Sequence, residues 1–325
     1  MSNTHSLDLE LSSNQYAKLA DNATMSITGN MTLMAWVRPE TMVATMSIIS
    51  KYDSGDDRRS YGLRFLGAGT GALQFAVSSD GTSANLTSAD SNYIFFNGDL
   101  AVAWFHVAVT YNAAAGTCKF YVNGALDSTG ASLKTSIFNS TADFRIGADD
   151  NTSGAGSLIP FDGLIKHVRV FNTELTAAQV LAEAHASTSA NSPVGAWELN
   201  NDLLDSSGNG QTLTAVGSPV FAATVPFADS GTTVELQASI DAYIDSANPT
   251  TNFGTATEIN VGDSNADTPL TRTLIKFDLS SIPSTATINS VFLILTFIGD
   301  LSSSARVFNV YRVLRAWTEA GATWN

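Results

Sequence analysis

Apolar and polar residues alternate with a period of two in many short segments, and this alternation constrains the fold more than any other feature. Residues 31–38 (MTLMAWVR) and 104–111 (WFHVAVTY) are two clear examples. Successive side chains of a strand point to opposite faces, so the pattern is typical of half-buried strands. Similar segments occur at 61–65, 73–77, 119–122, 144–146 and 164–171. Because turn signals rather than helices separate these segments, we predict an all-β chain built as sandwiches.

One helix interrupts the strand pattern. Thr176 followed by Gln179 fits a capping box, and apolar residues then recur at helical spacing up to Ala184. A breaker-rich linker (HASTSANSP, 185–193) ends this helix, and a second breaker zone (VPFADSG) spans 225–231. We place the main boundary near Asp229, which predicts a module at 1–228 and a second β module at 229–325.

Composition excludes several classes of partner. The formal net charge is −14 at pH 7, so a phosphate backbone or an anionic membrane surface would be repelled. Only 14% of the residues are charged, which suits neutral polar ligands better than ionic ones. The chain has one cysteine, Cys118, and therefore no intramolecular disulfide. No segment approaches transmembrane length, and the N-terminus lacks the charged and apolar regions of a signal peptide.

A search for catalytic residues gives no complete set. Asp8 and Glu10 share one face of a predicted strand, but the third carboxylate of a jelly-roll hydrolase motif is missing. His106 and His167 lie within predicted strands and are interpreted as structural residues. We therefore predict a protein without enzymatic activity.

Glycan binding requires flat aromatic rings beside amide and carboxylate groups. Four aromatic residues lie in or beside predicted loops, and we take them as candidates for stacking on sugars. They are Tyr52, Tyr61, Tyr93 and Phe96.

Most of the first module resembles the laminin-G-like (concanavalin A-like) jelly roll. The resemblance rests on five segments in the expected order: 6–10 (SLDLE), 31–40 (MTLMAWVRPE), 104–111 (WFHVAVTY), 120–124 (FYVNG) and 161–172 (FDGLIKHVRVFN). Residues 195–199 (GAWEL) and 205–210 (DSSGNG) resemble a segment that many relatives carry before their first strand. We expect residues 194–222 to return to the same sandwich as a permuted closing segment.

Residues 233–325 resemble the DNRLRE domain, also described as carbohydrate-binding module family 96. The matching segments are 241–244 (DAYI), 252–254 (NFG), 272–283 (RTLIKFDLSSIP) and 317–325 (WTEAGATWN). In that family the domain continues past the final Trp-Asn. The resemblance therefore implies an incomplete second β-sandwich, completed by further sequence or by another chain.

The first resemblance also implies a calcium site. Relatives often hold calcium at the turn that corresponds to 205–210, and clustered oxygen ligands suit this hard cation. Asp205 and Asn209 are the expected ligands, with Asp162 as their partner.

Three functions remain open from the sequence. The first is a non-catalytic, extracellular surface protein that binds a polysaccharide or surface glycan for adhesion. The second is a virion structural protein, such as a capsid decoration or fibre component that contacts neighbouring copies or other surface proteins. The third, which we expect least, is a set of accessory modules of a polysaccharide-degrading enzyme.

Overall fold

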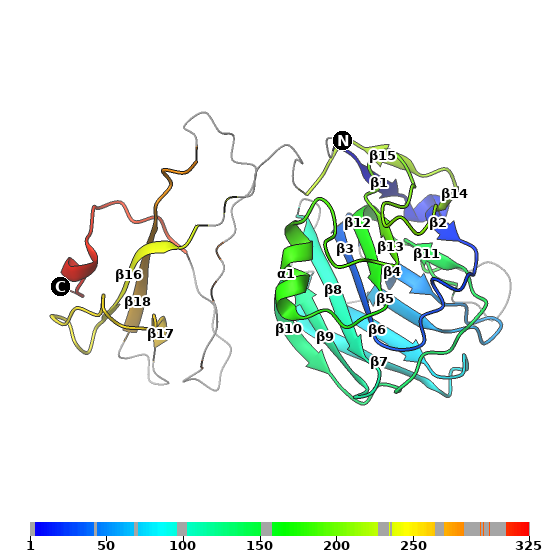
Figure 1. Cartoon of the computed structure of the whole chain (residues 1–325), viewed down its shortest axis with the longest axis horizontal. Helices are drawn as coiled ribbons and strands as arrows, with labels where there is room; N and C mark the ends of the chain where they lie inside the picture. Colours follow the sequence, from blue (N-terminus) through cyan, green and yellow to red (C-terminus); the bar gives the residue numbers. More distant parts are fainter. Residues whose placement is uncertain are drawn as a thin grey trace. The chain divides into compact units, whose positions relative to one another are not determined.

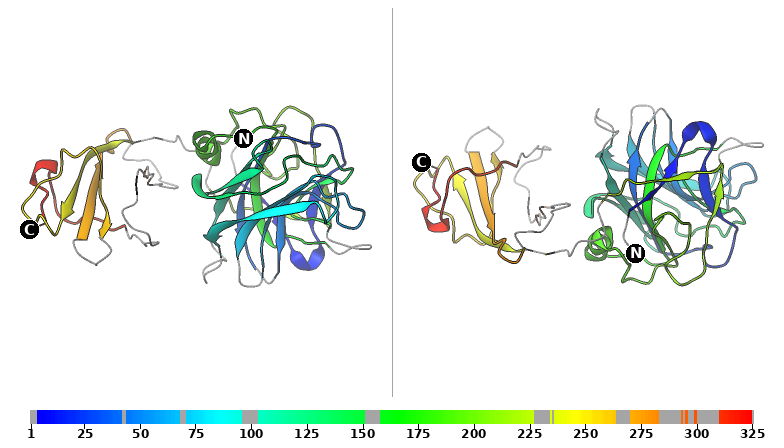
Figure 2. Two further views of the ribbon diagram at one scale, coloured as in Figure 1. Left: turned by 90° about the horizontal axis from the view of Figure 1, so that it is seen from below. Right: turned by 90° about the horizontal axis from the view of Figure 1, so that it is seen from above.

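The computed structural model confirms the all-β prediction and divides the chain into two units, Met1–Ser230 and Gly231–Asn325. It describes residues 4–41, 44–67, 71–95, 103–150, 158–226, 234, 236–263, 270–282, 293, 295, 299 and 310–324. Two antiparallel sheets of the first unit face each other and form a jelly-roll sandwich (Figures 1 and 2).

The first sheet, sheet A, contains the central strands of the predicted pattern. Its order is β10(Ala125–Gly130), β9(Thr117–Val122), β8(Phe105–Asn112), β3(Met31–Pro39), β12(Gly163–Phe171), β1(Ser6–Leu9) and β15(Val220–Ala222), and β13(Gly195–Trp197) pairs with β12. The second sheet, sheet B, runs β14(Thr214–Val216), β2(Tyr16–Leu19), β11(Phe144–Ile146), β4(Met46–Lys51), β5(Tyr61–Phe65), β6(Ala72–Ser78) and β7(Leu86–Ile94).

The core lies between the two sheets and is formed by the inward residue of each alternating pair. Leu33, Leu63, Phe75 and Val109 are fully buried members of this core. Burying one such side chain contributes about 1.5–3 kcal/mol, so the repeated alternation supplies the main driving force for this architecture.

The segment at 194–222 adds two short strands to sheet A and one to sheet B. β13 pairs with β12, β14 pairs with β2, and β15 pairs with β1. Trp197 from β13 is fully buried, and its ring stacks on Phe144 of sheet B. The segment therefore packs within the same sandwich as the strands that precede it.

The helix α1(Ala177–His185) covers the outer face of sheet A. Its capping box is confirmed: the Thr176 hydroxyl accepts the backbone N–H of Gln179, and the Gln179 side chain accepts the backbone N–H of Thr176. Val180 of the helix packs with Met34, Ala108 and Tyr121 from the sheet in a second apolar cluster. The Trp36 indole N–H donates to the carbonyl of Ala184, which fixes the helix end to the sheet.

A β-bulge in β12 lies among three buried basic side chains, of which Arg169 contacts this helix. The register against β3 shifts between Lys166 and Arg169, and His167 has a φ of 47°. A bulge inserts one extra residue and re-aims the side chains around it. Three basic residues of β12 are buried although they are polar: Lys166, His167 and Arg169.

The second unit contains a three-stranded antiparallel sheet in the order β16(Ala238–Asp245), β18(Leu270–Phe277) and β17(Gly262–Asp263). Two of its sequence motifs contact each other: the Asn252 amide donates to the carbonyls of Glu319 and Ala322. A Cβ at Gly254 would lie 2.7 Å from the carbonyl oxygen of Glu319, so only glycine allows this close approach. These contacts explain why the segments NFG and EAGATWN occur together.

Candidate functional site

The outer face of sheet B carries a hydrogen-bonded row of polar side chains. In β5 and β6, Leu63 and Phe75 point into the core, so their neighbours Arg64 and Gln74 point outward. Arg64 pairs with Gln74, and Gln74 pairs with Asp90 of β7. The Arg64 Nε–H donates to Gln74 Oε1 at 2.9 Å, and Gln74 Nε2 donates to Asp90 Oδ1 at 2.8 Å. This polar row therefore crosses three strands with fixed side-chain orientations.

The guanidinium group of Arg64 lies close to the ring of Tyr52 and to the carboxylate of Asp149. Its guanidinium carbon lies 5.8 Å from the centre of the Tyr52 ring, within the range of a cation–π contact. Its Nη1 lies 3.7 Å from Asp149 Oδ2, which allows an ion pair but not a hydrogen bond. The Arg64 side chain is 16% exposed, so part of it reaches solvent.

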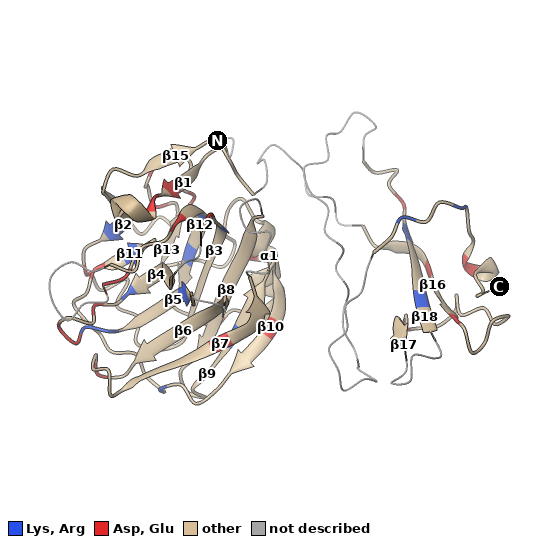
Figure 3. Cartoon of the chain, turned by 180° about the vertical axis from the view of Figure 1, so that it is seen from behind, with Lys and Arg blue, Asp and Glu red and all other residues tan. Residues whose placement is uncertain are grey.

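Arg64, Arg145, Asp149 and Asp150 form a group that we call the arginine–aspartate cluster. Arg145 points outward from β11, donates from Nη2 to Asp150 Oδ2 at 3.0 Å, and stacks on the Tyr16 ring at 5.3 Å. Charged segments gather around β2, β11 and β5 in Figure 3. The cluster joins the polar row to the side of the sheet nearest β2.

Asp149 is the most unusual member of the cluster. Its side chain is 2% exposed, and its Oδ1 has no hydrogen-bond partner among the described residues. Burial raises the pKa of Asp149 to about 7, although Arg64 and Arg145 oppose this effect. A buried polar atom without a partner costs free energy, which marks this position as one that a ligand or a water molecule would satisfy.

Tyr93 provides an aromatic surface on β7, three residues beyond Asp90. It is 40% exposed and is the one exposed aromatic side chain among the described residues of the first unit. The rings of Phe95 and Phe105 lie 4.6 Å and 6.2 Å from it, centre to centre. Asp127 Oδ2 accepts the backbone N–H groups of Tyr93 and Asn92. Backbone hydrogen bonds and ring contacts together therefore fix the position of Tyr93.

The other three glycan candidates have different environments. Tyr61 is fully buried in the core, where its hydroxyl donates to the carbonyl of Met25 at 2.9 Å. Tyr52 is 5% exposed and supports Arg64 from within the outer face. Phe96 lies outside the described residues. Nearness to a loop could not distinguish an exposed tyrosine from a buried one. Tyr52 directly follows the end of β4, and Tyr61 is the first residue of β5.

The expected calcium ligands lie in two places. Asp205 accepts the backbone N–H groups of Ala196, Ser207 and Gln211. Burial opposes its ionisation, yet these hydrogen bonds hold the pKa of Asp205 below its usual value. The Asn209 side-chain amide donates to the carbonyls of Pro193 and Val194. The turn is thus stabilised by its own Asx-type bonds.

Asp162 lies near the opposite end of β12 from this turn. It precedes Gly163, which pairs with Leu9, whereas the turn is bonded to Ala196, which pairs with Arg169. The structure therefore does not bring Asp162 together with Asp205 and Asn209.

Asp162 instead faces a group of acidic residues at the start of the chain. One carboxylate oxygen each from Asp8, Glu10 and Glu40 lies within 4.8 Å of the others. Burial raises the pKa of Asp8, and the charges of Glu40 and Asp162 add to this effect. Asp162 itself accepts the backbone N–H of Leu11 and the hydroxyl of Thr41. Oxygen ligands of this kind suit a hard cation.

The histidines have structural surroundings. Burial lowers the pKa of His106 to about 3, and Arg169 and the other histidines nearby add to this effect. His106 packs edge-on against Trp36. His167 pairs with Glu198, and Glu198 also lies 3.8 Å from Arg169. These residues lie between sheet A and the segments that cover it.

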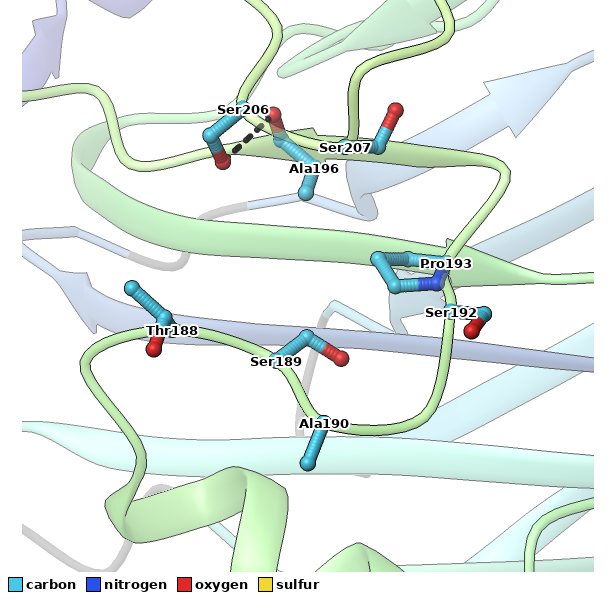
Figure 4. Close-up of a pocket in the computed structure, with 8 residues that line it drawn as sticks. All are labelled: Thr188, Ser189, Ala190, Ser192, Pro193, Ala196, Ser206 and Ser207. Carbon is cyan, nitrogen blue, oxygen red and sulfur yellow. Dashed lines mark hydrogen bonds between the residues drawn. The ribbon is translucent and has the colours of Figure 1, made fainter.

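A hydroxyl-lined pocket of about 260 Å³ lies between the linker after α1 and the 205–210 turn (Figure 4). Ser206 on its wall donates to the carbonyl of Ala196, and the hydroxyl of Ser189 donates to Glu183. Its lining is Thr188, Ser189, Ala190, Ser192, Pro193, Ala196, Ser206 and Ser207.

Sequence reasoning missed the polar row and Arg145. Two acidic segments, 53–57 and 149–151, lie far apart in the sequence. In the structure Asp53 and Asp150 form a β-bridge, so the described parts of these loops meet. The alternation Leu63-Arg64-Phe65 and Leu73-Gln74-Phe75 is the signal that could have placed Arg64 and Gln74 on one face.

Residues 11–181 match the profile of the concanavalin A-like lectin/glucanases superfamily, which covers more than half of the chain. The chain belongs to this superfamily. Residues 232–325 match carbohydrate-binding module family 96, in the predicted order. The search among curated proteins finds no match.

Several solved structures are similar to part of this chain. A SAP-like pentraxin from Limulus polyphemus has 15% identity and a TM-score of 0.49, covering 67% of this chain and 94% of the pentraxin. A putative carbohydrate-binding protein from Bacteroides ovatus has 19% identity and a TM-score of 0.49, covering 69% of this chain and 63% of that protein. The sialidase module CBM40 of Ruminococcus gnavus, bound to sialyllactose, has 14% identity and a TM-score of 0.44, covering 57% and 98%. Among the described residues, no helix is long and apolar enough to cross a membrane.

Proposed function

We propose that this chain is a non-catalytic glycan-binding protein, and that its first unit binds a polysaccharide or surface glycan on sheet B. The lectin superfamily and the carbohydrate-binding module in the second unit support this function. Modules of these families typically act outside the cell, so we propose an extracellular location and a role in adhesion. Attachment to a virion surface stays a prediction from the sequence.

The observation that carries the proposal is that β7 contributes both an exposed aromatic ring, Tyr93, and the last member of the polar row, Asp90. Tyr93 offers an exposed ring whose orientation is fixed by Phe95 and Phe105. The row from Asp90 to Arg64 spans two interstrand spacings, or about 10 Å. This is close to the length of two pyranose rings, so two adjoining sugars could bond along the row, while Tyr93 offers a ring for stacking on the same strand as Asp90.

We expect binding without catalysis on sheet B, since the group of three clustered carboxylates lies elsewhere. Asp8, Glu10 and Glu40 form the clustered acidic group, and Asp8 belongs to β1 of sheet A. Tyr93 and the polar row belong to sheet B. The carboxylates next to the row, Asp149 and Asp150, are paired with Arg64 and Arg145.

A glycan array with the labelled full chain tests the proposal. Replacing Tyr93 by alanine should weaken binding roughly threefold to tenfold, because one stacking contact is lost, whereas Tyr93→Trp should keep it. Leu204→Ala is the matched control, since Leu204 is also exposed at 59% but lies in the turn region far along the chain. Binding by Tyr93→Ala equal to that of the original chain would refute this site.

A further inference from the structure

The arginine–aspartate cluster has more hydrogen-bond donors than acceptors. Arg145 uses Nη2 on Asp150, but its buried Nε and Nη1 have no partner among the described residues. Arg64 uses Nε on Gln74, and its Nη1 is too far from Asp149 for a hydrogen bond. Donors that stay unpaired in a buried place are unfavourable, so the cluster favours a group that brings acceptor oxygens.

A carboxylate is the acceptor group that fits a guanidinium group best. It offers two oxygens with several lone pairs, and guanidinium–carboxylate contacts are strong because both partners are charged. Arg64 is already oriented by Gln74 and Tyr52, so little side-chain freedom is lost on binding.

We propose that the cluster binds the carboxylate of an acidic sugar, such as a hexuronate unit, at the end of the glycan that stacks on Tyr93. This inference rests on the proposed glycan-binding function and names the chemical class of the glycan. Arg64 would contact the carboxylate directly, because its side chain reaches solvent, and Arg145 would add charge from β11, two strands away from β5.

Asp149 makes this site sensitive to pH. The charged groups that act on it are Arg64 from β5, Arg145 from β11 and Asp150 on its own segment. Burial raises the pKa of Asp149 to about 7, so it is largely protonated at pH 6 and ionised at pH 8. When Asp149 is ionised it competes for Arg64, and the four cluster residues have no net charge. When it is neutral the cluster carries one positive charge, which favours an anionic ligand.

The net charge of the whole chain works against a long polyanion. At −14 it would repel an acidic polysaccharide at low ionic strength. At about 0.15 M salt the screening length is about 8 Å, so distant charges contribute little and the local cluster decides the result. Binding experiments therefore need physiological salt.

Affinity electrophoresis of the full chain can test the inference at 0.15 M salt. The gels contain either polygalacturonate or the same polymer with its carboxylates methyl-esterified, and they are run at pH 6 and pH 8. We expect the acidic polymer to retard the chain more strongly than the ester, and more strongly at pH 6 than at pH 8. Arg64→Gln should reduce this preference about tenfold, since one charge-assisted contact is lost. Arg38→Gln is the matched control, because Arg38 is 20% exposed but lies on β3 of sheet A.

Asp149→Asn provides the second variant. It removes the titrating group and should make retardation by the acidic polymer independent of pH between 6 and 8. Equal retardation by both polymers, or an Arg64→Gln chain that behaves like the original, would overturn the inference. If both polymers retard the chain equally and Tyr93→Ala reduces both effects, glycan binding stands and the acidic class fails. If neither polymer retards the chain, the acidic class is wrong whatever the glycan array shows.

Discussion

Arg169 Nη1 and Glu183 Oε2 form an ion pair at 2.7 Å in which both side chains are only 1% exposed. Arg169 comes from the bulged strand β12, and Glu183 comes from α1. Glu183 Oε1 also accepts the amide of Asn191 and the hydroxyl of Ser189. One carboxylate therefore joins the sheet, the helix and the linker that follows the helix.

Removing one partner of this pair should destabilise the first unit strongly. Arg169→Met leaves the Glu183 carboxylate buried without its cation, and we expect a loss of about 3–5 kcal/mol in the free energy of unfolding. Urea unfolding followed by tryptophan fluorescence measures this loss. Lys18→Met is the control, because its pair with Asp143 is 40% and 26% exposed and should contribute less than about 1 kcal/mol. Equal effects of the two substitutions would contradict the assigned role of the buried pair.

The capping box of α1 gives a smaller, separable effect. Thr176→Ala removes the hydroxyl that accepts the Gln179 N–H and should cost about 1 kcal/mol. Thr176→Ser keeps the acceptor and should restore most of that stability. Denaturant unfolding of both variants checks the prediction, and a loss of the same size in Thr176→Ser would show that the methyl group, not the cap, is responsible.

Stability should fall in acid partly because of His106. Its pKa is lowered to about 3 in the folded state by burial, whereas an unfolded histidine titrates near its ordinary value of 6.5. Between pH 3 and 6.5 His106 is protonated in the unfolded chain but not in the folded one. Its contribution to the free energy of unfolding is therefore fully present above pH 6.5 and is lost as pH falls towards 3. Relative to the original chain, His106→Phe should therefore gain stability as pH falls from 7 to 4, by up to about 1.4 kcal/mol per unit. Parallel pH curves for the two chains would contradict this assignment.

Asp149 should contribute with the opposite sign. Its folded pKa is raised to about 7, so the folded state holds the proton more tightly between the ordinary value of 3.8 and 7. Stability from this group is present below pH 3.8 and is lost as pH rises towards 7. Asp149→Asn should therefore be more stable than the original chain at pH 8 and lose that advantage at pH 4. Thermal melting at the two pH values measures the difference, and a constant offset would show that Asp149 does not titrate in this range.

The sequence predicted those parts of the fold that depend on local patterns. Alternation identified the strands because each of them has one face in a dry core, and the Thr176–Gln179 spacing identified the helix start because capping is a local interaction. The polar row could not be found in the same way. Arg64, Gln74 and Asp90 are joined by strand pairing across residues far apart in sequence, and register is not visible in one sequence. Tyr61 shows the converse difficulty, since a tyrosine beside a loop can equally well be a core residue with a satisfied hydroxyl.

Calcium binding is the remaining prediction from the sequence. Substitutions at two places can test it separately: the group of Asp8, Glu10 and Glu40, and the 205–210 turn. We expect calcium to raise the melting temperature of the full chain, because an ion that binds the folded state alone must stabilise it. If the ion binds at Asp8, Glu10 and Glu40, Glu10→Gln should abolish the rise, since it removes one carboxylate with little loss of packing at an exposed position. Asp205→Asn should lower the melting temperature with and without calcium, because the Asp205 carboxylate accepts three backbone N–H groups in the absence of any ion. A calcium response that Asp205→Asn abolishes and Glu10→Gln leaves intact would assign the ion to the 205–210 turn, and a melting temperature unchanged by excess chelator would remove calcium from the description of this protein.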